Sequence, residues 1–212
     1  MKKYMGIIFD LDGVLCITDR YHYQAWKRIA DTLKIEFNEA KNHRLRGVSR
    51  MESLDIILEN YDKPLSVEEK IALAEEKNRY YREFLETMSE SDIEDAVFAT
   101  LDELRVRRYL LAIGSSSKNA GFILEKTGLI KYFDAISDGN GLNKSKPDPE
   151  VFLRAADDLR LAPEKCLVVE DAAAGIMAAL AGGFDSAGIG DGTAVPGVTY
   201  RLERFEELLE VV

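Results

Sequence analysis

Apolar and polar residues follow two different patterns along this chain of 212 residues. A short apolar run at 4–9 predicts a buried strand, which Asp10-Leu11-Asp12-Gly13 ends as a loop. From residue 19 to residue 88 the apolar positions instead recur every three or four residues, as at Tyr23, Trp26 and Ile29. This spacing is typical of amphipathic helices, and it predicts an all-helical unit directly after the first strand.

Two capping boxes mark helix starts inside that unit. Ser49-Arg50-Met51-Glu52 predicts a helix to about Leu58, and Ser66-Val67-Glu68-Glu69 predicts a longer helix to about Met88. In each box the serine and the glutamate satisfy backbone N–H groups that lack partners at a helix start.

From about residue 96 helical and strand patterns alternate. The expected strands cover 109–113, 135–137, 166–169 and 186–189. The expected helices cover 96–107, a segment that Gly128 ends, a segment from Lys146-Pro147-Asp148-Pro149 to about 159, 172–181 and 202–211. Alternation of this kind predicts an α/β fold with a parallel sheet and helices on both faces. We expect a core domain of residues 1–17 and 90–212, with an inserted α-helical cap domain of residues 18–89.

The composition is that of a globular protein, with 46% hydrophobic and 31% charged residues. The net charge of −10 argues against broad nucleic-acid binding. No apolar stretch has the length of a membrane span, and no secretion signal is evident. Cys16 and Cys166 lie far apart in the sequence and are expected to be buried free thiols. These features predict a cytoplasmic protein, and we expect a monomer because no apolar surface is evident from the pattern.

The negative charge is unevenly distributed. Between residues 20 and 88 the basic and acidic residues balance, so the whole excess of −10 lies outside the helical unit. The acidity therefore does not exclude an anionic ligand bound partly by that unit.

Polar side chains follow each of the expected strands that form the core. Asp10 and Asp12 follow the first strand, Ser115-Ser116-Ser117 the second, Lys146 the third, and Glu170-Asp171 the fourth. Ligands of parallel sheets bind beyond the carboxyl ends of the strands, so these groups are expected to converge. Clustered carboxylates repel one another unless a cation is present, and hard oxygen ligands suit Mg²⁺. Hydroxyls and a lysine beside such a cluster suit the oxygens of a transferring phosphoryl group.

Taken one at a time, these residues also suit ordinary structural roles. Asp-Leu-Asp-Gly occurs in turns, serines before a helix cap its N-terminus, and acidic residues there complement the helix dipole. Their occurrence together at strand ends favours a catalytic site.

In order, Asp10-Leu11-Asp12-Gly13-Val14, Ser115, Lys146-Pro147 and Glu170-Asp171 with Gly175 resemble the motifs of the haloacid dehalogenase superfamily. The resemblance implies a Rossmann-like parallel sheet with an inserted helical cap. It also implies that Asp10 is a nucleophile, that Asp12 is the general acid and base, and that Ser115 and Lys146 hold the phosphoryl oxygens. Mg²⁺ would be held by Asp10, the Asp12 carbonyl, Glu170 and Asp171.

Details of the helical unit, and of the core segment 117–119, are similar to the β-phosphoglucomutase family within that superfamily. The matching residues are Thr18, His22, Trp26, Arg46, Gly47, Val48, Arg50, Lys77, Asn78, Ser117, Lys118 and Asn119. By this resemblance the substrate is a phosphosugar, and Arg50, Ser117 and Asn119 would bind its second phosphate. The remaining substrate contacts would come from Thr18, His22, Trp26, Arg46, Gly47, Val48, Lys77, Ser116 and Lys118.

Several residues of the helical unit are equally compatible with a structural role. Arg50 and Lys77 suit a solvated surface, His22 suits an ordinary helix face, and Trp26 suits the apolar core of the cap. The chain also departs from the family pattern at Ala172-Ala173, at the additional hydroxyl of Ser116, and at 91–94, where Pro-Gly is absent. The leading interpretation is interconversion of β-D-glucose 1-phosphate and glucose 6-phosphate, and the alternatives are a small-molecule phosphatase and a phosphosugar-binding protein without catalysis.

Overall fold

The computed structural model describes residues 3–212 and contains a six-stranded parallel sheet of order β3-β2-β1-β4-β5-β6. The strands are β1 (Gly6–Phe9), β2 (Leu110–Gly114), β3 (Ala135–Ser137), β4 (Cys166–Glu170), β5 (Asp185–Ile189) and β6 (Tyr200–Leu202). The central strand β1 pairs in register with both β2 and β4, so that Phe9 lies between Ile113 and Val169. The residues that follow these three strands therefore leave the sheet side by side.

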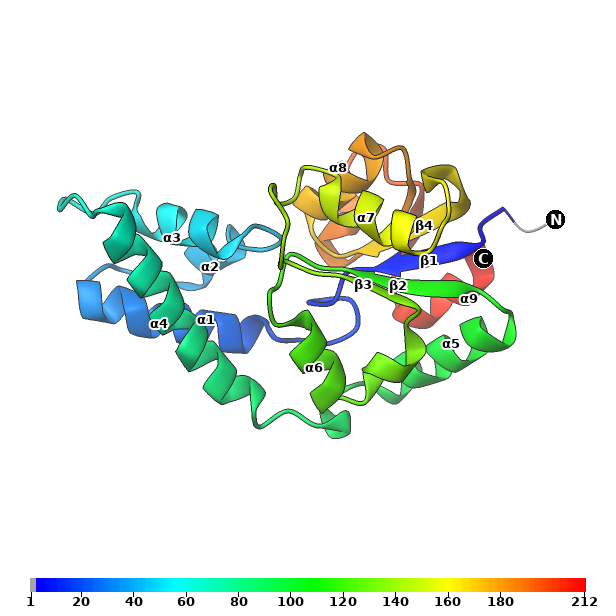
Figure 1. Cartoon of the computed structure of the whole chain (residues 1–212), viewed down its shortest axis with the longest axis horizontal. Coiled ribbons are helices and arrows are strands. Elements are labelled where there is room, and N and C mark those ends of the chain that lie inside the picture. The colour runs from blue at the N-terminus through cyan, green and yellow to red at the C-terminus, as the bar shows by residue number, and fades with distance from the viewer. Residues whose placement is uncertain (1–2) are drawn as a thin grey trace.

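The helices divide into two groups. Four lie between β1 and α5 and form the helical unit: α1 (Asp19–Leu33), α2 (Glu39–His43), α3 (Arg50–Leu58) and α4 (Val67–Leu85). Five accompany the sheet: α5 (Asp95–Val106), α6 (Ala120–Lys126), α7 (Glu150–Asp158), α8 (Ala173–Ala181) and α9 (Leu208–Val211). Figure 1 shows the helical unit on one side of the molecule and the sheet with its covering helices on the other.

Alternate residues of the central strands face two separate apolar layers, as expected for a sheet buried on both faces. Ile8, Ala112 and Val168 pack with α7 and α8. Ile7, Leu111 and the neighbouring inward residues pack with α5, α6 and α9. These layers, visible above and below the sheet in Figure 1, hold the strand ends in fixed positions.

The helical unit has an apolar cluster of its own around Trp26, Leu54 and Ile57. Other residues of its helices, such as Tyr21 and Leu85, join the larger cluster beneath the sheet. The unit is therefore packed partly on itself and partly on the core. The start of β1 and the C-terminal α9 lie at the opposite end of the molecule from it (Figure 1).

Most of the expected elements are present within one or two residues of their predicted bounds. Both capping boxes form, and Gly128 takes the left-handed conformation (φ +69°) that ends α6. The helix predicted to reach Met88 ends at Leu85, and α2 was not predicted as a separate helix.

The predicted helix at 202–211 is wrong over most of its length. Leu202 ends a sixth strand, which pairs with β5, and only Leu208–Val211 is α-helical. Leu202, Phe205 and Leu208 are all buried at a spacing of three, which imitates a helical face. Strand pairing at the sheet edge outweighs that local pattern.

Within residues 3–212, no helix combines the length and the apolar character required to cross a bilayer. Cys16 and Cys166 are both free and buried, as predicted.

Candidate active site

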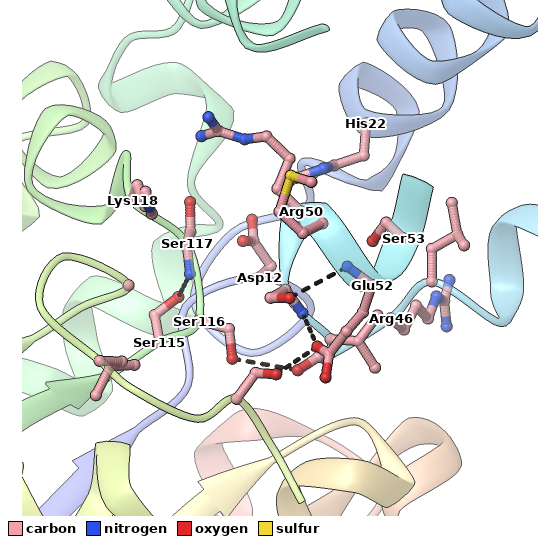
Figure 2. A pocket seen from close by; sticks show the side chains of 18 of the residues that line it. Asp12, His22, Arg46, Arg50, Glu52, Ser53, Ser115, Ser116, Ser117 and Lys118 are labelled. Carbon is pink, nitrogen blue, oxygen red and sulfur yellow. Dashed lines mark hydrogen bonds between the residues drawn. The ribbon is translucent and has the colours of Figure 1, made fainter. Parts of the chain in front are cut away.

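A cleft of about 1290 Å³ separates the carboxyl ends of the strands from the helical unit. We call its two sides the strand wall (residues 10–13, 115–119, 139–149 and 171) and the helical wall (residues 17–26, 42–53 and 71–81). Figure 2 shows Ser115, Ser116 and Ser117 entering from the strand wall, with His22 and Arg50 on the helical wall.

Three carboxylates meet at the bottom of the strand wall. Asp10 follows β1, Glu170 is the last residue of the adjacent strand β4, and Asp171 follows it. One oxygen from each of the three lies within 4.8 Å of the others. The parallel register of β1 and β4 therefore brings together acidic residues that are far apart in the sequence.

Two glycines provide the space for this crowding. A Cβ on Gly13, which has a φ of +88°, would lie 2.1 Å from Asp171 Oδ2. A Cβ on Gly175 would lie 2.0 Å from the Glu170 Cδ. A larger residue at either position would displace a carboxylate of the cluster.

Lys146 lies beneath the cleft and is paired with two of these carboxylates. Its Nζ is 2.6 Å from Asp10 Oδ1 and 2.7 Å from Glu170 Oε2, and the residue is 1% exposed. Burial alone would lower the pKa of Lys146, but the charges of Asp10 and Glu170 outweigh it and raise that pKa above its ordinary value. Lys146 is thus a fixed positive charge directly beside Asp10.

One lysine does not balance the three carboxylates. Burial, followed by the charge of Asp10, raises the pKa of both Glu170 and Asp171. Such shifts indicate that ionised carboxylates are destabilised here without a further cation. The oxygen donors of Asp10, Glu170 and Asp171 are the ligand type that Mg²⁺ prefers, so this group of residues fits a divalent metal ion.

Asp12 lies at the cleft and has a carboxyl group suited to carrying a proton. Burial, and then the charge of Asp10, raises the pKa of Asp12 to about 7. The hydroxyl of Thr18 donates a hydrogen bond to Asp12 Oδ1. A group that titrates near neutral pH can both give and accept a proton during a reaction.

The helical wall contains a second buried lysine. Lys77 Nζ lies within hydrogen-bond distance of His22 Nδ1, at 2.9 Å, and 4.4 Å and 5.1 Å from the ring centres of Tyr81 and Trp26. Burial, and then the charge of Arg50, lowers the pKa of Lys77. Burial also lowers the pKa of His22, followed by the charge of Lys77. Burial thus disfavours the charged forms of both side chains.

Arg50 of the helical wall and Asn119 of the strand wall are linked by a shared contact with Asn78. Arg50 Nη2 and Asn119 Nδ2 each donate to Asn78 Oδ1 at 2.9 Å. On the strand wall, Ser117 Oγ accepts from the Asn119 backbone N–H at 3.2 Å. The donor groups of Arg50 and Asn119 and the nearby Ser117 and Lys118 make a polar, cationic region distinct from the carboxylate cluster.

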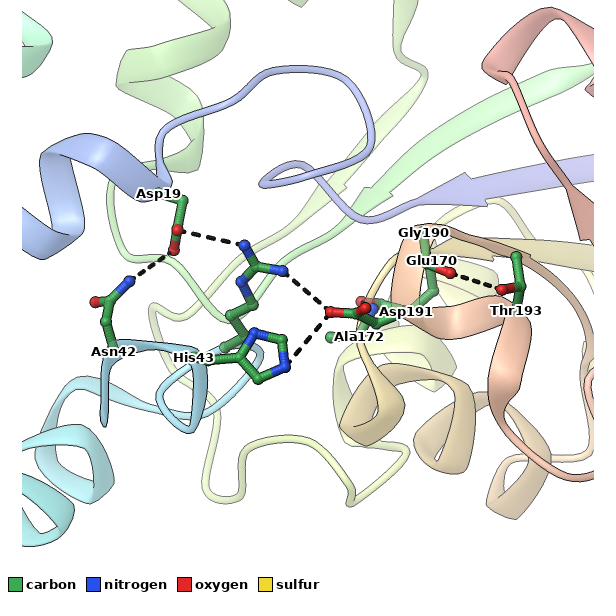
Figure 3. Close-up of polar contacts among 9 residues, drawn as sticks. Asp19, Asn42, His43, Glu170, Ala172, Gly190, Asp191 and Thr193 are labelled. Atoms are coloured by element: carbon green, nitrogen blue, oxygen red, sulfur yellow. Dashed lines mark hydrogen bonds and ion pairs between the residues drawn. The ribbon is translucent and has the colours of Figure 1, made fainter. Parts of the chain in front are cut away.

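Further polar contacts join the two walls near the entrance of the cleft. Ser116 Oγ donates to the Gly47 carbonyl at 3.2 Å, and Ser145 donates to the Glu52 carboxylate. Arg46 forms ion pairs with Asp19 of its own wall at 3.3 Å and with Asp191 of the core at 3.2 Å. Both aspartates are labelled in Figure 3, where dashed lines mark these contacts. The helical unit is therefore seated on the core through several independent contacts.

A family model described as a haloacid dehalogenase-like hydrolase matches residues 4–183. The chain belongs to the haloacid dehalogenase-like hydrolases. The resemblance of its motifs to that superfamily is thereby confirmed.

Individual members of the family resemble this chain over nearly its whole length. The β-phosphoglucomutase of Bacillus subtilis is 37% identical over 205 residues, which cover 96% of this chain and 91% of the relative. The phosphorylated carbohydrates phosphatase of Thermotoga maritima is 31% identical over 97% of this chain and 90% of its own length. The crystal structure of β-phosphoglucomutase from Clostridium difficile superposes with a TM-score of 0.92 at 36% identity, covering 97% of this chain and 93% of that one.

In this haloacid dehalogenase-like hydrolase, most of the predicted site residues line one cleft. They are Asp10, Asp12, His22, Trp26, Arg46, Gly47, Val48, Arg50, Lys77, Ser115, Ser116, Ser117, Lys118, Asn119 and Asp171. Lys146 and Glu170 lie just beneath the surface of the cleft, in contact with Asp10 or with each other. The structure thus brings together the groups that the sequence placed at separate strand ends.

Three of the predicted substrate contacts are buried or already engaged by other residues of the protein. Thr18 is fully buried and contacts Asp12 rather than the open cleft. Arg46 lines the cleft, but its guanidinium is engaged by Asp19 and Asp191. Trp26 is 1% exposed and belongs to the apolar cluster of the helical unit as well as to the cleft.

Sequence reasoning missed Asp191 and gave Asn78 no role of its own. Asp191 comes two residues after β5, so the search for polar residues at strand ends would have found it had it been extended to the fifth strand. Asn78 was noted only as part of a resemblance, since an asparagine inside a helix gives no signal of its contacts.

Proposed function

We propose that the protein is a β-phosphoglucomutase, which interconverts β-D-glucose 1-phosphate and glucose 6-phosphate through a glucose 1,6-bisphosphate. The supporting observation is that one cleft holds two separate groups suited to phosphate. One is Asp10 with Ser115 and Lys146, and the other is Arg50 with Asn119 and its neighbours. A sugar carrying two phosphates needs both.

Asp10 is proposed as the nucleophile. A carboxylate oxygen attacks phosphorus, the bond from phosphorus to the sugar oxygen breaks, and an aspartyl-phosphate results. Lys146 lies 2.6 Å from that carboxylate, and Ser115 is the first residue after β2. Both are placed to bind the phosphoryl oxygens as negative charge accumulates on them.

Asp12 is proposed as the general acid and base. It protonates the sugar oxygen as that oxygen leaves, and it accepts the proton of the other sugar hydroxyl when the phosphoryl group returns. Its raised pKa of about 7 permits both roles near neutral pH, and Thr18 fixes the carboxyl orientation through its hydroxyl.

Mg²⁺ is proposed as the cofactor, held by Asp10, the Asp12 carbonyl, Glu170 and Asp171. When bound, the ion neutralises the carboxylate cluster and the charge of the phosphate oxygens. The region of residues 18–89 is proposed as a cap domain over a core of residues 1–17 and 90–212. His22 and Lys77 would orient the sugar, and closure would exclude water from the aspartyl-phosphate.

A sugar-phosphate phosphatase is the second candidate, favoured by the 31% identity to the Thermotoga maritima phosphatase. Incubation with Mg²⁺, β-D-glucose 1-phosphate and a trace of glucose 1,6-bisphosphate separates the two. The mutase produces glucose 6-phosphate with little inorganic phosphate. Stoichiometric inorganic phosphate without glucose 6-phosphate would establish the phosphatase instead.

A further inference from the structure

Asn78 is the point at which the helical wall and the strand wall share one hydrogen-bond acceptor. Its Oδ1 accepts from Arg50 of α3 and from Asn119, the residue that precedes α6, at 2.9 Å in each case. Asn78 itself belongs to α4, so three separate elements meet at one oxygen atom.

The chemistry of the partners determines which way the Asn78 amide faces. A guanidinium can only donate hydrogen bonds, so the atom beside Arg50 must be the carbonyl oxygen and not the amide nitrogen. Asn119 must then donate through its Nδ2 to the same oxygen. The orientation of both side-chain amides is consequently fixed by one arginine.

The Asn78 oxygen is also neutral. A carboxylate here would form an ion pair with Arg50 and would repel an incoming phosphate, whereas an amide oxygen orients the guanidinium and leaves its charge uncompensated. Asn78 accepts a hydrogen bond only from Nη2 of Arg50. This contact orients the guanidinium and leaves its other N–H groups available to bind a ligand.

We propose that Asn78 is a positioning residue for the phosphate that is not being transferred. It holds Arg50 and Asn119 in the relative positions that the phosphate requires, and it does so only when the helical unit is seated on the core. This inference rests on the proposed function, because it presupposes a substrate with a second phosphate. Asn78 contacts the two phosphate ligands and not the reacting atoms.

The direct test is a binding measurement that does not depend on turnover. In an Asp10→Asn background, calorimetry with Mg²⁺ gives the Kd of glucose 1,6-bisphosphate for Asn78→Leu and Asn78→Asp. We expect Kd to rise about tenfold for Asn78→Leu, because two hydrogen bonds to phosphate ligands are lost. The Kd of glucose 1,6-bisphosphate should rise further in Asn78→Asp, because this substitution places a negative charge beside the ligand. Asn60→Leu and Asn60→Asp make the same chemical changes at an exposed turn and should stay within about twofold of the background.

A second readout separates positioning from a general structural role. With Asp10 intact, hydrolysis of p-nitrophenyl phosphate probes the nucleophile without a second phosphate. The loss caused by Asn78→Leu should be at least about fivefold smaller with this substrate than the loss in bisphosphate affinity. Equal losses in both assays, or bisphosphate Kd values matching the Asn60 controls, would overturn the proposal.

Failure of the proposed function would look different. It would appear in the wild-type enzyme, as absence of glucose 6-phosphate formation, whereas failure of the Asn78 proposal appears only in the comparison of variants.

Discussion

The strand wall and the helical wall each bury a lysine, and the two lysines have opposite pKa shifts. Lys146 contacts two carboxylates, which raise its pKa, whereas Lys77 contacts an imidazole and two aromatic rings, and burial lowers its pKa. Burial is nearly the same, at 1% and 2% exposed, so the partners account for the difference.

This comparison separates two ways of building a polar site. On the strand wall, the sheet register brings together three carboxylates, of which Lys146 pairs with two, and the remaining excess of negative charge favours binding of a cation. On the helical wall, burial lowers the pKa of Lys77 and of His22, and a bound anion would oppose these shifts by stabilising the charged forms. The strand wall thus fits a cation, whereas the helical wall fits an anion.

The largest effect is expected from removal of the Asp10 carboxylate. Asp10→Asn keeps the shape but leaves an amide that cannot form the aspartyl-phosphate, so turnover should fall by a factor of about 10³ or more. The measurement is the rate of glucose 6-phosphate formation. Asp62→Asn, an exposed carboxylate outside the cleft, is the control and should keep full activity. Turnover by Asp10→Asn at the control rate would refute both the mutase and the phosphatase mechanism.

Replacement of the two lysines by methionine tests the comparison itself. Lys146→Met leaves Asp10 and Glu170 without a cation, so in the presence of a chelator unfolding should become easier by about 3–5 kcal/mol. Lys77→Met removes a lysine that has no carboxylate within ion-pair distance among residues 3–212, and it should cost less than about 1.5 kcal/mol. Urea unfolding measures both values. Equal destabilisation would show that the pairing of Lys146 is not what distinguishes the two walls.

The contribution of the buried carboxyl groups to the stability of the metal-free protein should fall as pH rises. Glu170 and Asp171 have raised pKa values and Asp12 has a pKa of about 7, so the folded state retains protons that the unfolded chain loses at lower pH. Their contribution is therefore present in acid and is lost between the ordinary carboxyl range, near pH 4, and about pH 8, the pKa of folded Glu170.

Mg²⁺ should compensate for that loss. The rise in Tm on addition of Mg²⁺ should be larger at about pH 8 than at about pH 5.5. Each kcal/mol by which Mg²⁺ increases the free energy of unfolding should raise Tm by roughly 3 °C. Thermal unfolding in chelator, in MgCl₂ and in NaCl of equal ionic strength measures the difference. If Tm did not depend on Mg²⁺ and rose steadily from pH 5.5 to pH 8, the carboxylate cluster would not be the source of the pH dependence.

The smallest effect is expected at the exposed contact between the walls. Asp191→Asn removes the ion pair with Arg46, in which the two side chains are 57% and 37% exposed. Exposed ion pairs contribute about 0–1 kcal/mol, so KM should rise by no more than about fivefold and kcat should change little. The effect should shrink further as salt is added, because screening already weakens the pair. An effect of Asp191→Asn that is independent of salt would indicate a role other than this ion pair.

Sequence reasoning was most successful where backbone regularity carries the information. Asp10, Ser115 and Glu170 lie at the ends of neighbouring parallel strands, so their convergence follows from the order and direction of the strands. Capping boxes likewise place Arg50 at the first turn of α3. These features depend on local residues and on a general property of parallel sheets.

What the sequence could not predict depends on how the two walls meet. The shared oxygen of Asn78, the partners of Arg46 and the burial of Thr18 are set by packing between segments distant in the chain. The lowered pKa of Lys77 could not be predicted either. Two glutamates precede this lysine in the sequence, but in the fold its Nζ contacts His22 instead of them. The sixth strand was missed for a related reason, since only pairing with β5 makes residues 200–202 extended.

The direction of the parallel sheet has a practical consequence for handling the protein. All six strands run toward the cleft, and α9 lies with the beginnings of those strands at the far end of the molecule (Figure 1). A linker added after Val212 would therefore leave from the side opposite the substrate entrance. Attachment to a surface, or fusion to an enzyme that supplies β-D-glucose 1-phosphate, should leave both walls free to close on their ligand.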